Sequence, residues 1–180
     1  MVGVVNPADF RTAINSGSTK KNYIGQFGYN RENTKFIYGV QTFGVVGFPN
    51  NAVQNDLIVE HKFDEKLTLA VNITNTNYWT NFGKSWNSAA VYVKYAVQEN
   101  LKLNYRGEFF NSDVQLYNML YKPYRASNII SNTISANYIV GGFTIIPEIR
   151  LDASSKEIFM LNDKASKINA FFVLGTTYKF

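Results

Sequence analysis

Residues Ser166–Phe180 read SKINAFFVLGTTYKF and end the sequence on an aromatic side chain. Successive side chains of a β-strand point to opposite faces. One face of this segment would carry Ile168, Ala170, Phe172, Leu174, Thr176, Tyr178 and Phe180. The other face is wetter and includes Lys167, Asn169, Thr177 and Lys179. About 9–11 tilted residues cross a bilayer core, with aromatic side chains at its interfaces. The segment therefore predicts a transmembrane β-strand.

The bulk composition agrees with a membrane barrel and excludes a helical membrane protein. Charged residues make up 17% of the 180 residues, below the roughly 25% that is usual in soluble domains. Aromatic residues reach 16%, and the mean hydropathy is only −0.18. Barrel strands place polar groups at every second residue, which dilutes hydropathy. We expect one outer-membrane β-barrel domain over residues 1–180, with the alternative that it is the carboxy-terminal portion of a longer barrel.

Several classes of chemistry have no support in the sequence. The chain has no cysteine, so a disulfide framework or a zinc finger is excluded. The net charge of +5 is scattered, with no cationic run longer than Lys20-Lys21, so no nucleic-acid partner is expected. His61 is the only histidine and has no Ser or Cys beside it. We predict no enzyme activity, no catalytic residue, no metal site and no cofactor.

Apolar alternation bounded by turn residues predicts ten strands and no helix. The architecture expected from them is all-β, an antiparallel up-and-down transmembrane β-barrel. Pro147 falls within one of these strands and cannot donate to the ladder, so it predicts a bulge or a locally unpaired position. The expected strands are Met1–Asn6, Asn22–Asn30, Thr34–Gly44, Asn55–Phe63, Leu67–Thr76, Asn87–Val97, Leu101–Asn111, Ser127–Val140, Phe143–Ala153 and Ser166–Phe180.

Short and long connections alternate along the chain. Transmembrane barrels have short turns on the periplasmic rim and longer loops on the extracellular rim. This alternation predicts that the carboxy terminus is periplasmic in a bacterial outer membrane. The short connections are Arg31–Asn33, Asp64–Lys66, Gln98–Asn100 and Gly141–Gly142. The long ones are Asn6–Lys21, Val45–Gln54, Asn77–Trp86, Ser112–Ala126 and Ser154–Ala165.

Most charged residues of the strands have the parity opposite to the apolar one. A charge on the lipid face costs about 2–4 kcal/mol at mid-membrane, so we expect these residues to line the lumen. They could set ion preference, or they could form a satisfied polar interior that only solubilises or plugs the lumen. The candidates are Asp56, Glu60, Lys62, Lys94, Lys102, Arg106, Glu108, Glu148, Arg150 and Asp152.

Three stretches of the sequence resemble one known family. They are Val2–Asn6, Asn104–Phe110 with its Arg-x-Glu, and Thr144–Asp152 with its Pro-Glu-x-Arg-x-Asp, followed by the terminal strand that ends in Phe. In this order they resemble the OmpL-like β-barrel porins of the porin-2 type. The resemblance covers essentially the whole chain, which is similar to the carboxy-terminal half of longer members. It implies an outer-membrane porin of Gram-negative bacteria.

These observations leave three hypotheses of function. The first is a porin-like passive channel for small polar solutes. The second is a non-conducting structural or accessory barrel subunit of an outer-membrane protein complex, and the third is a soluble calycin-like ligand carrier. Expected partners are outer-membrane lipid, the outer-membrane assembly machinery that would read the terminal strand at Tyr178 and Phe180, and other outer-membrane proteins.

The first residues suggest how the chain relates to a complete barrel. Met1–Val5 lacks the features of a secretory signal, so we expect either a mature form with an added Met or part of a longer gene product. Met1–Asn6 is also too short to pair along the whole of Ser166–Phe180. We therefore expect the closing partner of the terminal strand to lie outside this chain.

Overall fold

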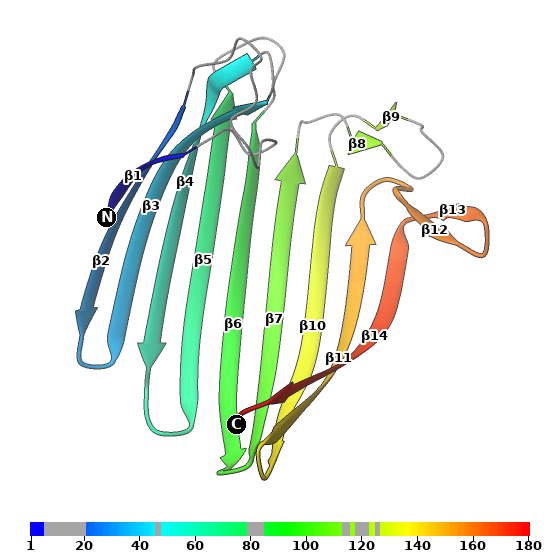
Figure 1. The fold of residues 1–180 in the computed structure, drawn as a ribbon. Helices are drawn as coiled ribbons and strands as arrows, with labels where there is room; N and C mark the ends of the chain where they lie inside the picture. The colour runs from blue at the N-terminus through cyan, green and yellow to red at the C-terminus, as the bar shows by residue number, and fades with distance from the viewer. Residues whose placement is uncertain (6–20, 46–47, 79–84, 113–115, 118–122, 125–126) are drawn as a thin grey trace.

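The fold is one antiparallel sheet of ten strands with two small two-stranded ribbons (Figure 1). A computed structural model describes residues 1–5, 21–45, 48–78, 85–112, 116–117, 123–124 and 127–180. Within these residues, no helix is long and apolar enough to span a membrane. The strands of the sheet are β1 (Val2–Val5), β2 (Asn22–Arg31), β3 (Thr34–Val45), β4 (Phe48–Lys62), β5 (Leu67–Tyr78), β6 (Trp86–Gln98), β7 (Leu101–Ser112), β10 (Ser127–Val140), β11 (Phe143–Ser154) and β14 (Ile168–Tyr178). The ribbons are β8 (Leu116–Tyr117) with β9 (Pro123–Tyr124), and β12 (Phe159–Leu161) with β13 (Lys164–Ser166).

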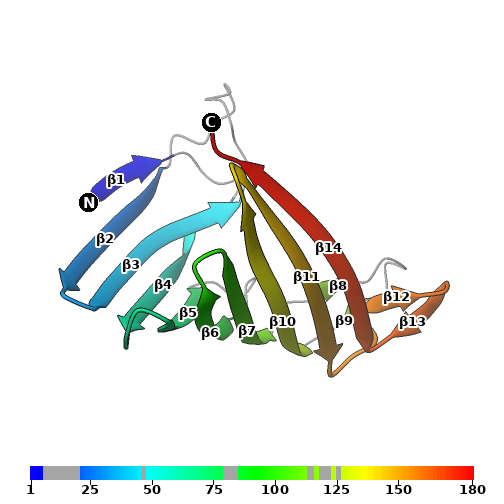
Figure 2. The same cartoon turned by 90° about the horizontal axis from the view of Figure 1, so that it is seen from below.

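The strands follow one another in the sheet in their order along the chain, and every neighbouring pair is antiparallel. This confirms the predicted all-β, up-and-down architecture. Seen from below, the sheet bends into an open arch (Figure 2). The sheet does not close into a barrel: β1 and β14 do not pair with each other, and both remain edge strands. β1 has four residues against eleven in β14.

The long strands have the length that a bilayer requires. All strands of the sheet except β1 have 10 to 15 residues. A tilted strand of about 9–11 residues crosses a hydrocarbon core. The predicted strand centres are right, because period-two alternation persists until a turn residue interrupts it.

The four expected short turns lie at one end of the sheet, which is the lower end in Figure 1, and the carboxy terminus lies at that end too. One expected long connection is wrong. Val45–Gln54 was predicted as a loop, but β4 already begins at Phe48 and Val45 pairs with it. The Gln41 side chain donates to Gln54 Oε1 over 3.1 Å, so polar residues extend this hairpin. Residues 6–20 and 79–84 of two other expected loops lie outside the described residues.

Pro147 interrupts the ladder between β10 and β11, as its missing N–H predicts. Pairing runs from Ile129 opposite Ser154 to Ser135 opposite Glu148, and it resumes only at Tyr138 opposite Ile145. On its other side, Pro147 stays in register with Leu174 of β14. The proline therefore leaves a local gap in the ladder without shifting the register.

Asp64 fixes the short turn between β4 and β5. Its Oδ1 accepts hydrogen bonds from the backbone N–H groups of Lys66 and Leu67, each 2.7 Å long. These bonds favour the carboxylate, so the pKa of Asp64 lies below its ordinary value of 3.8. Glu65, the next residue in this turn, makes no side-chain hydrogen bond or ion pair among the described residues.

We expect Asp64→Asn to destabilise the turn at neutral pH and to matter less in acid. A lowered pKa in the folded state gives stability that is fully present above pH 3.8 and is lost as the pH falls through the lowered pKa. The difference in urea midpoint between wild type and Asp64→Asn should therefore shrink as the pH falls below 3.8. Glu65→Gln is the control and should show no such dependence. A midpoint difference that stays constant into acid would contradict the role of Asp64.

Candidate functional site

The two faces of the sheet have opposite chemistry, and the apolar face is the exposed one. Among the described residues, the only buried hydrophobic side chains are Ala52, Ala70 and Ala90. Buried polar residues outnumber them: Asn22, Thr74, Thr76, Ser131, Thr133, Asp152 and Ser154. Soluble proteins show the reverse. Figure 2 shows the sheet bent into an arch, and side chains on the inside of an arch crowd one another. The buried polar set therefore lies on the concave face, and the exposed apolar set lies on the convex face.

The pairing register gathers the ten charged candidates on the polar face. Residues paired across neighbouring strands share a face. One cross-strand row runs through Glu60, Ala70, Tyr92, Arg106, Thr133 and Arg150. The next row toward the short turns runs through Lys62, Thr68, Lys94, Asn104, Ser135 and Glu148. Asp56, Lys102, Glu108 and Asp152 have the same parity in their strands.

Four of these candidates form one connected ion-pair cluster, which we call the charge ladder: Arg106, Glu108, Arg150 and Asp152. Arg150 Nη1 lies 2.6 Å from Glu108 Oε2, and Arg150 Nε lies 2.8 Å from Asp152 Oδ1. Arg106 Nε lies 3.1 Å from the same Glu108 oxygen, although its N–H is not aligned to donate to it. Glu108 thus joins β7 to β11 across β10. The side chains are 10% to 35% exposed, so water screens the ladder only in part.

The remaining candidates divide into paired and unpaired groups. Lys94 Nζ lies 2.8 Å from Glu60 Oε2, an ion pair that crosses β5 and is more exposed than the charge ladder. Asp56 Oδ1 accepts hydrogen bonds from the Asn72 amide at 2.9 Å and from the Thr74 hydroxyl at 2.6 Å. Three candidates have no side-chain hydrogen bond and no ion pair in the described part of the chain: Lys62, Lys102 and Glu148. Of these, Lys62 still acts electrostatically on Asp64, whose pKa it helps to lower.

Uncharged polar residues complete this face, and the charge-based prediction missed them. Asn104 donates to Asn137 Oδ1 over 3.1 Å and approaches Ser135 Oγ at 3.5 Å. Arg106 Nη2 approaches Thr133 Oγ1 at 3.5 Å. The signal was present in the sequence, because Ser131, Thr133, Ser135 and Asn137 alternate with apolar or outward-facing residues. Charge alone was too narrow a criterion.

Aromatic side chains on the convex face gather beside the short turns. Their exposed fractions lie between 42% and 57%. The terminal strand contributes Tyr178, whose ring centroid lies 4.7 Å from that of Phe143 and 6.3 Å from that of Phe180. The backbone N–H of Lys179 donates to Gly142 O over 2.8 Å, which holds this end against the last short turn. We call these residues the aromatic belt: Tyr29, Phe63, Tyr95, Tyr138, Phe143 and Tyr178.

His61 lies in the same rim, between a hydroxyl group and an aromatic ring. Its Nδ1 hydrogen-bonds the Thr34 hydroxyl at 2.8 Å, and its ring meets Phe63 edge-on with centroids 4.6 Å apart. Within the described ranges, no three His, Asp or Glu side chains converge as metal ligands would.

Comparison with known proteins identifies a family. The model of a family described as "Putative beta-barrel porin-2, OmpL-like" matches residues 1–180, which is the whole chain. No curated protein matches the sequence.

Glu108→Gln should destabilise the protein more than Glu60→Gln does. Loss of the Glu108 charge leaves Arg106 and Arg150 facing each other without their shared anion, at a cost of about 1–2 kcal/mol. Glu60→Gln removes only an exposed pair and should cost less than about 1 kcal/mol. Urea unfolding in lipid vesicles measures both. Equal effects of the two substitutions would contradict a structural role for the charge ladder.

Proposed function

The chain belongs to the OmpL-like porin-2 family of β-barrel porins. From this premise we propose that it forms the wall of an outer-membrane barrel through which small polar solutes diffuse. The observation that carries the proposal is the inverted sheet, with its apolar convex face and its polar, charged concave face. Diffusion through such a barrel requires neither a cofactor nor a catalytic residue. Selectivity would come from the charges on the concave face.

The exposed side chains of the convex face support the proposal that this face contacts lipid. Its large apolar side chains are among the most exposed of the chain, including Ile134, Ile149 and Phe172, each 63% exposed. Contiguous apolar surface of this kind is rare on soluble monomers and is typical of surfaces that meet a membrane or a partner. Ile149 and Phe172 are cross-strand partners, so the apolar surface continues across the strand boundary.

The position of the aromatic belt is evidence for where one boundary of the membrane would lie. Tyr and Trp rings prefer the head-group level, and barrels have aromatic girdles at both interfaces. The belt follows the short-turn end from Tyr29 to Tyr178. In barrels of this class, short turns are periplasmic, so we place Phe180 on the periplasmic side, where the assembly machinery would read the terminal strand.

The same surface argues against the calycin-like carrier. A soluble carrier turns polar side chains outward and lines its cavity with apolar ones. Here the convex face is apolar, and the concave face carries the charge ladder. A non-conducting accessory barrel is compatible with both faces, so conductance separates it from the channel.

Single-channel recording tests the channel directly. We expect the complete protein to give step-like currents in planar lipid bilayers. Circular dichroism and heat-modifiable mobility on a gel would establish that the sample is folded. No current steps from folded protein, together with stable co-purification with another outer-membrane assembly, would favour the accessory barrel instead.

A matched pair of substitutions on β11 tests which face meets lipid. Ile149→Arg puts a charge on the convex face and should cost about 2–4 kcal/mol of stability in a bilayer. Ile146→Arg makes the same chemical change on the concave face of the same strand, so we expect a much smaller loss. Urea unfolding in phospholipid vesicles measures the two losses. Similar losses for both variants would overturn the assignment of lipid-facing and solute-facing sides.

A further inference from the structure

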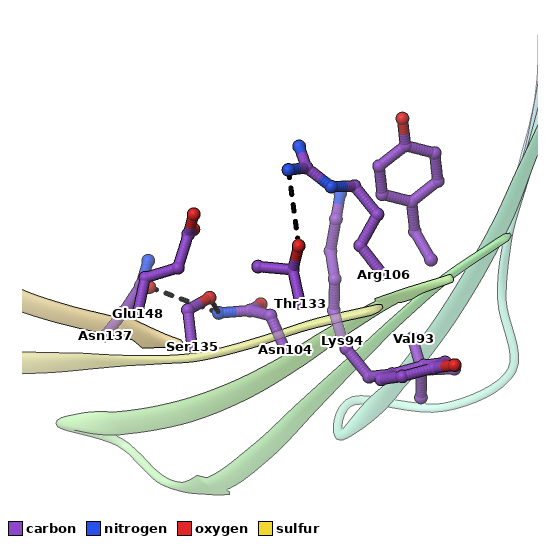
Figure 3. Close-up of a pocket in the computed structure, with 10 residues that line it drawn as sticks. Val93, Lys94, Asn104, Arg106, Thr133, Ser135, Asn137 and Glu148 are labelled. Atoms are coloured by element: carbon purple, nitrogen blue, oxygen red, sulfur yellow. Dashed lines mark hydrogen bonds between the residues drawn. The ribbon is translucent and has the colours of Figure 1, made fainter. Parts of the chain in front are cut away.

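A hollow of about 240 Å³ lies in the concave face where β6, β7, β10 and β11 meet. Figure 3 shows Arg106, Thr133 and Glu148 rising from the same side of the sheet. The gap that Pro147 leaves in the ladder between β10 and β11 adjoins it, since Glu148 and Asn137 both line the hollow. We call this feature the wall hollow.

The floor of the wall hollow offers neutral hydrogen-bonding groups. Asn104, Thr133, Ser135 and Asn137 contribute amide and hydroxyl groups from β7 and β10. Asn104 bonds to Asn137 within the floor, and Thr133 receives Arg106 Nη2. Hydroxyl and amide groups both donate and accept, so further hydrogen bonds to a solute remain open to them. Peptide N–H and C=O groups are suitable partners for such a floor.

The two sides of the wall hollow carry opposite charge. Lys94 and Arg106 supply cations from β6 and β7. Each already has a carboxylate within ion-pair distance, Glu60 for Lys94 and Glu108 for Arg106, so a solute carboxylate would share these cations with them. Glu148 supplies a carboxylate from β11, and it has no ion-pair or hydrogen-bond partner among the described residues. Glu148 is half-buried, and a carboxylate in that position is stabilised by a cation that comes to it. Its neighbours Glu108 and Asp152 are already neutralised within the charge ladder.

The spacing of the strands limits the length of a solute that touches both sides. Lys94 and Glu148 lie in one cross-strand row, separated by Asn104 and Ser135. Three strand spacings of about 4.8 Å place their backbones about 14 Å apart, and the Lys94 Nζ is directed away from Glu148, toward Glu60 across β5. Arg106 is one strand nearer, so about 10 Å of sheet separates its strand from that of Glu148. An extended chain of three residues spans about 10 Å. A single amino acid, whose amine and carboxylate share one carbon, is too short.

We propose that the wall hollow is a binding subsite for short zwitterionic peptides of about three residues. The solute carboxylate meets Lys94 and Arg106, the amine meets Glu148, and the peptide groups lie over the amide and hydroxyl floor. A simple cation would be repelled at one side and a simple anion at the other. The proposal rests on the channel function, because it makes the concave face the route of the solute.

Capped peptides test the subsite on the unmodified complete protein in detergent micelles. Saturation-transfer NMR would follow the methylene protons of triglycine, N-acetyltriglycine, triglycine amide and N-acetyltriglycine amide. Triglycine should bind about fivefold more tightly than either singly capped peptide, because each cap removes one exposed charge pair. Equal binding of triglycine and the doubly capped peptide, or no saturable binding of triglycine, would overturn the proposal.

Substitutions assign the two ends of the peptide. Glu148→Gln should abolish the preference for triglycine over N-acetyltriglycine and leave the preference over triglycine amide. Lys94→Gln should weaken the preference over triglycine amide without abolishing it, because Arg106 remains, and it should leave the preference over N-acetyltriglycine. Glu99→Gln and Lys102→Gln are the matched controls, because both residues lie outside the wall hollow, and they should change neither preference. Unchanged preferences in Glu148→Gln would also overturn the proposal.

Binding in micelles does not require conduction, so the two proposals fail separately. Current steps without peptide binding would leave the channel intact and remove the subsite. Charge-dependent peptide binding without current would retain the subsite and remove passive diffusion as its purpose.

Discussion

The pairing register of the antiparallel ladder is the constraint on which the other features depend. A shift of one residue in any strand would turn all its side chains to the opposite face. The register pairs Ile149 with Phe172 on one face and Thr133 with Arg106 on the other. The apolar surface, the aromatic belt and the charge ladder all follow from these pairings. The stability of the sheet and the chemistry of its concave face are therefore set by the same alternation, because each strand contributes to both faces.

The concave face needs its own charges to be compatible with folding. Polar side chains that are crowded together need partners, or they retain the full cost of lost hydration. Glu108 offsets the positive charge of two arginines, Arg106 and Arg150, since one of its oxygens lies within ion-pair distance of both. Glu148 is left out of that arrangement. Most of the charge on this face is neutralised internally, so Glu148 is one of the few charged groups there whose side chain has no partner among the described residues.

The sequence predicts what local periodicity determines and little of what depends on curvature. The strands, the short turns and the parity of Arg106 or Glu148 could be read from alternation, and Pro147 from its missing donor. Val45–Gln54 was misread as a loop because its Asn and Pro residues resemble turn signals, although pairing with β3 overrides them. The bond from Arg150 to Glu108 could not be predicted, because it joins strands that are not adjacent and depends on the bend of the sheet.

The open edges of the sheet restrict how a closed barrel can be completed. A bilayer core has no water to satisfy an unpaired backbone, so an edge strand such as β14 would have to be paired if it lies in a membrane. β14 runs toward the short-turn end, so an antiparallel partner must run away from it. β1 runs in that direction, but its four residues could pair with only part of the eleven in β14. A closed barrel therefore needs a strand of about β14's length at this edge, and whatever supplies that strand also determines the width of the barrel.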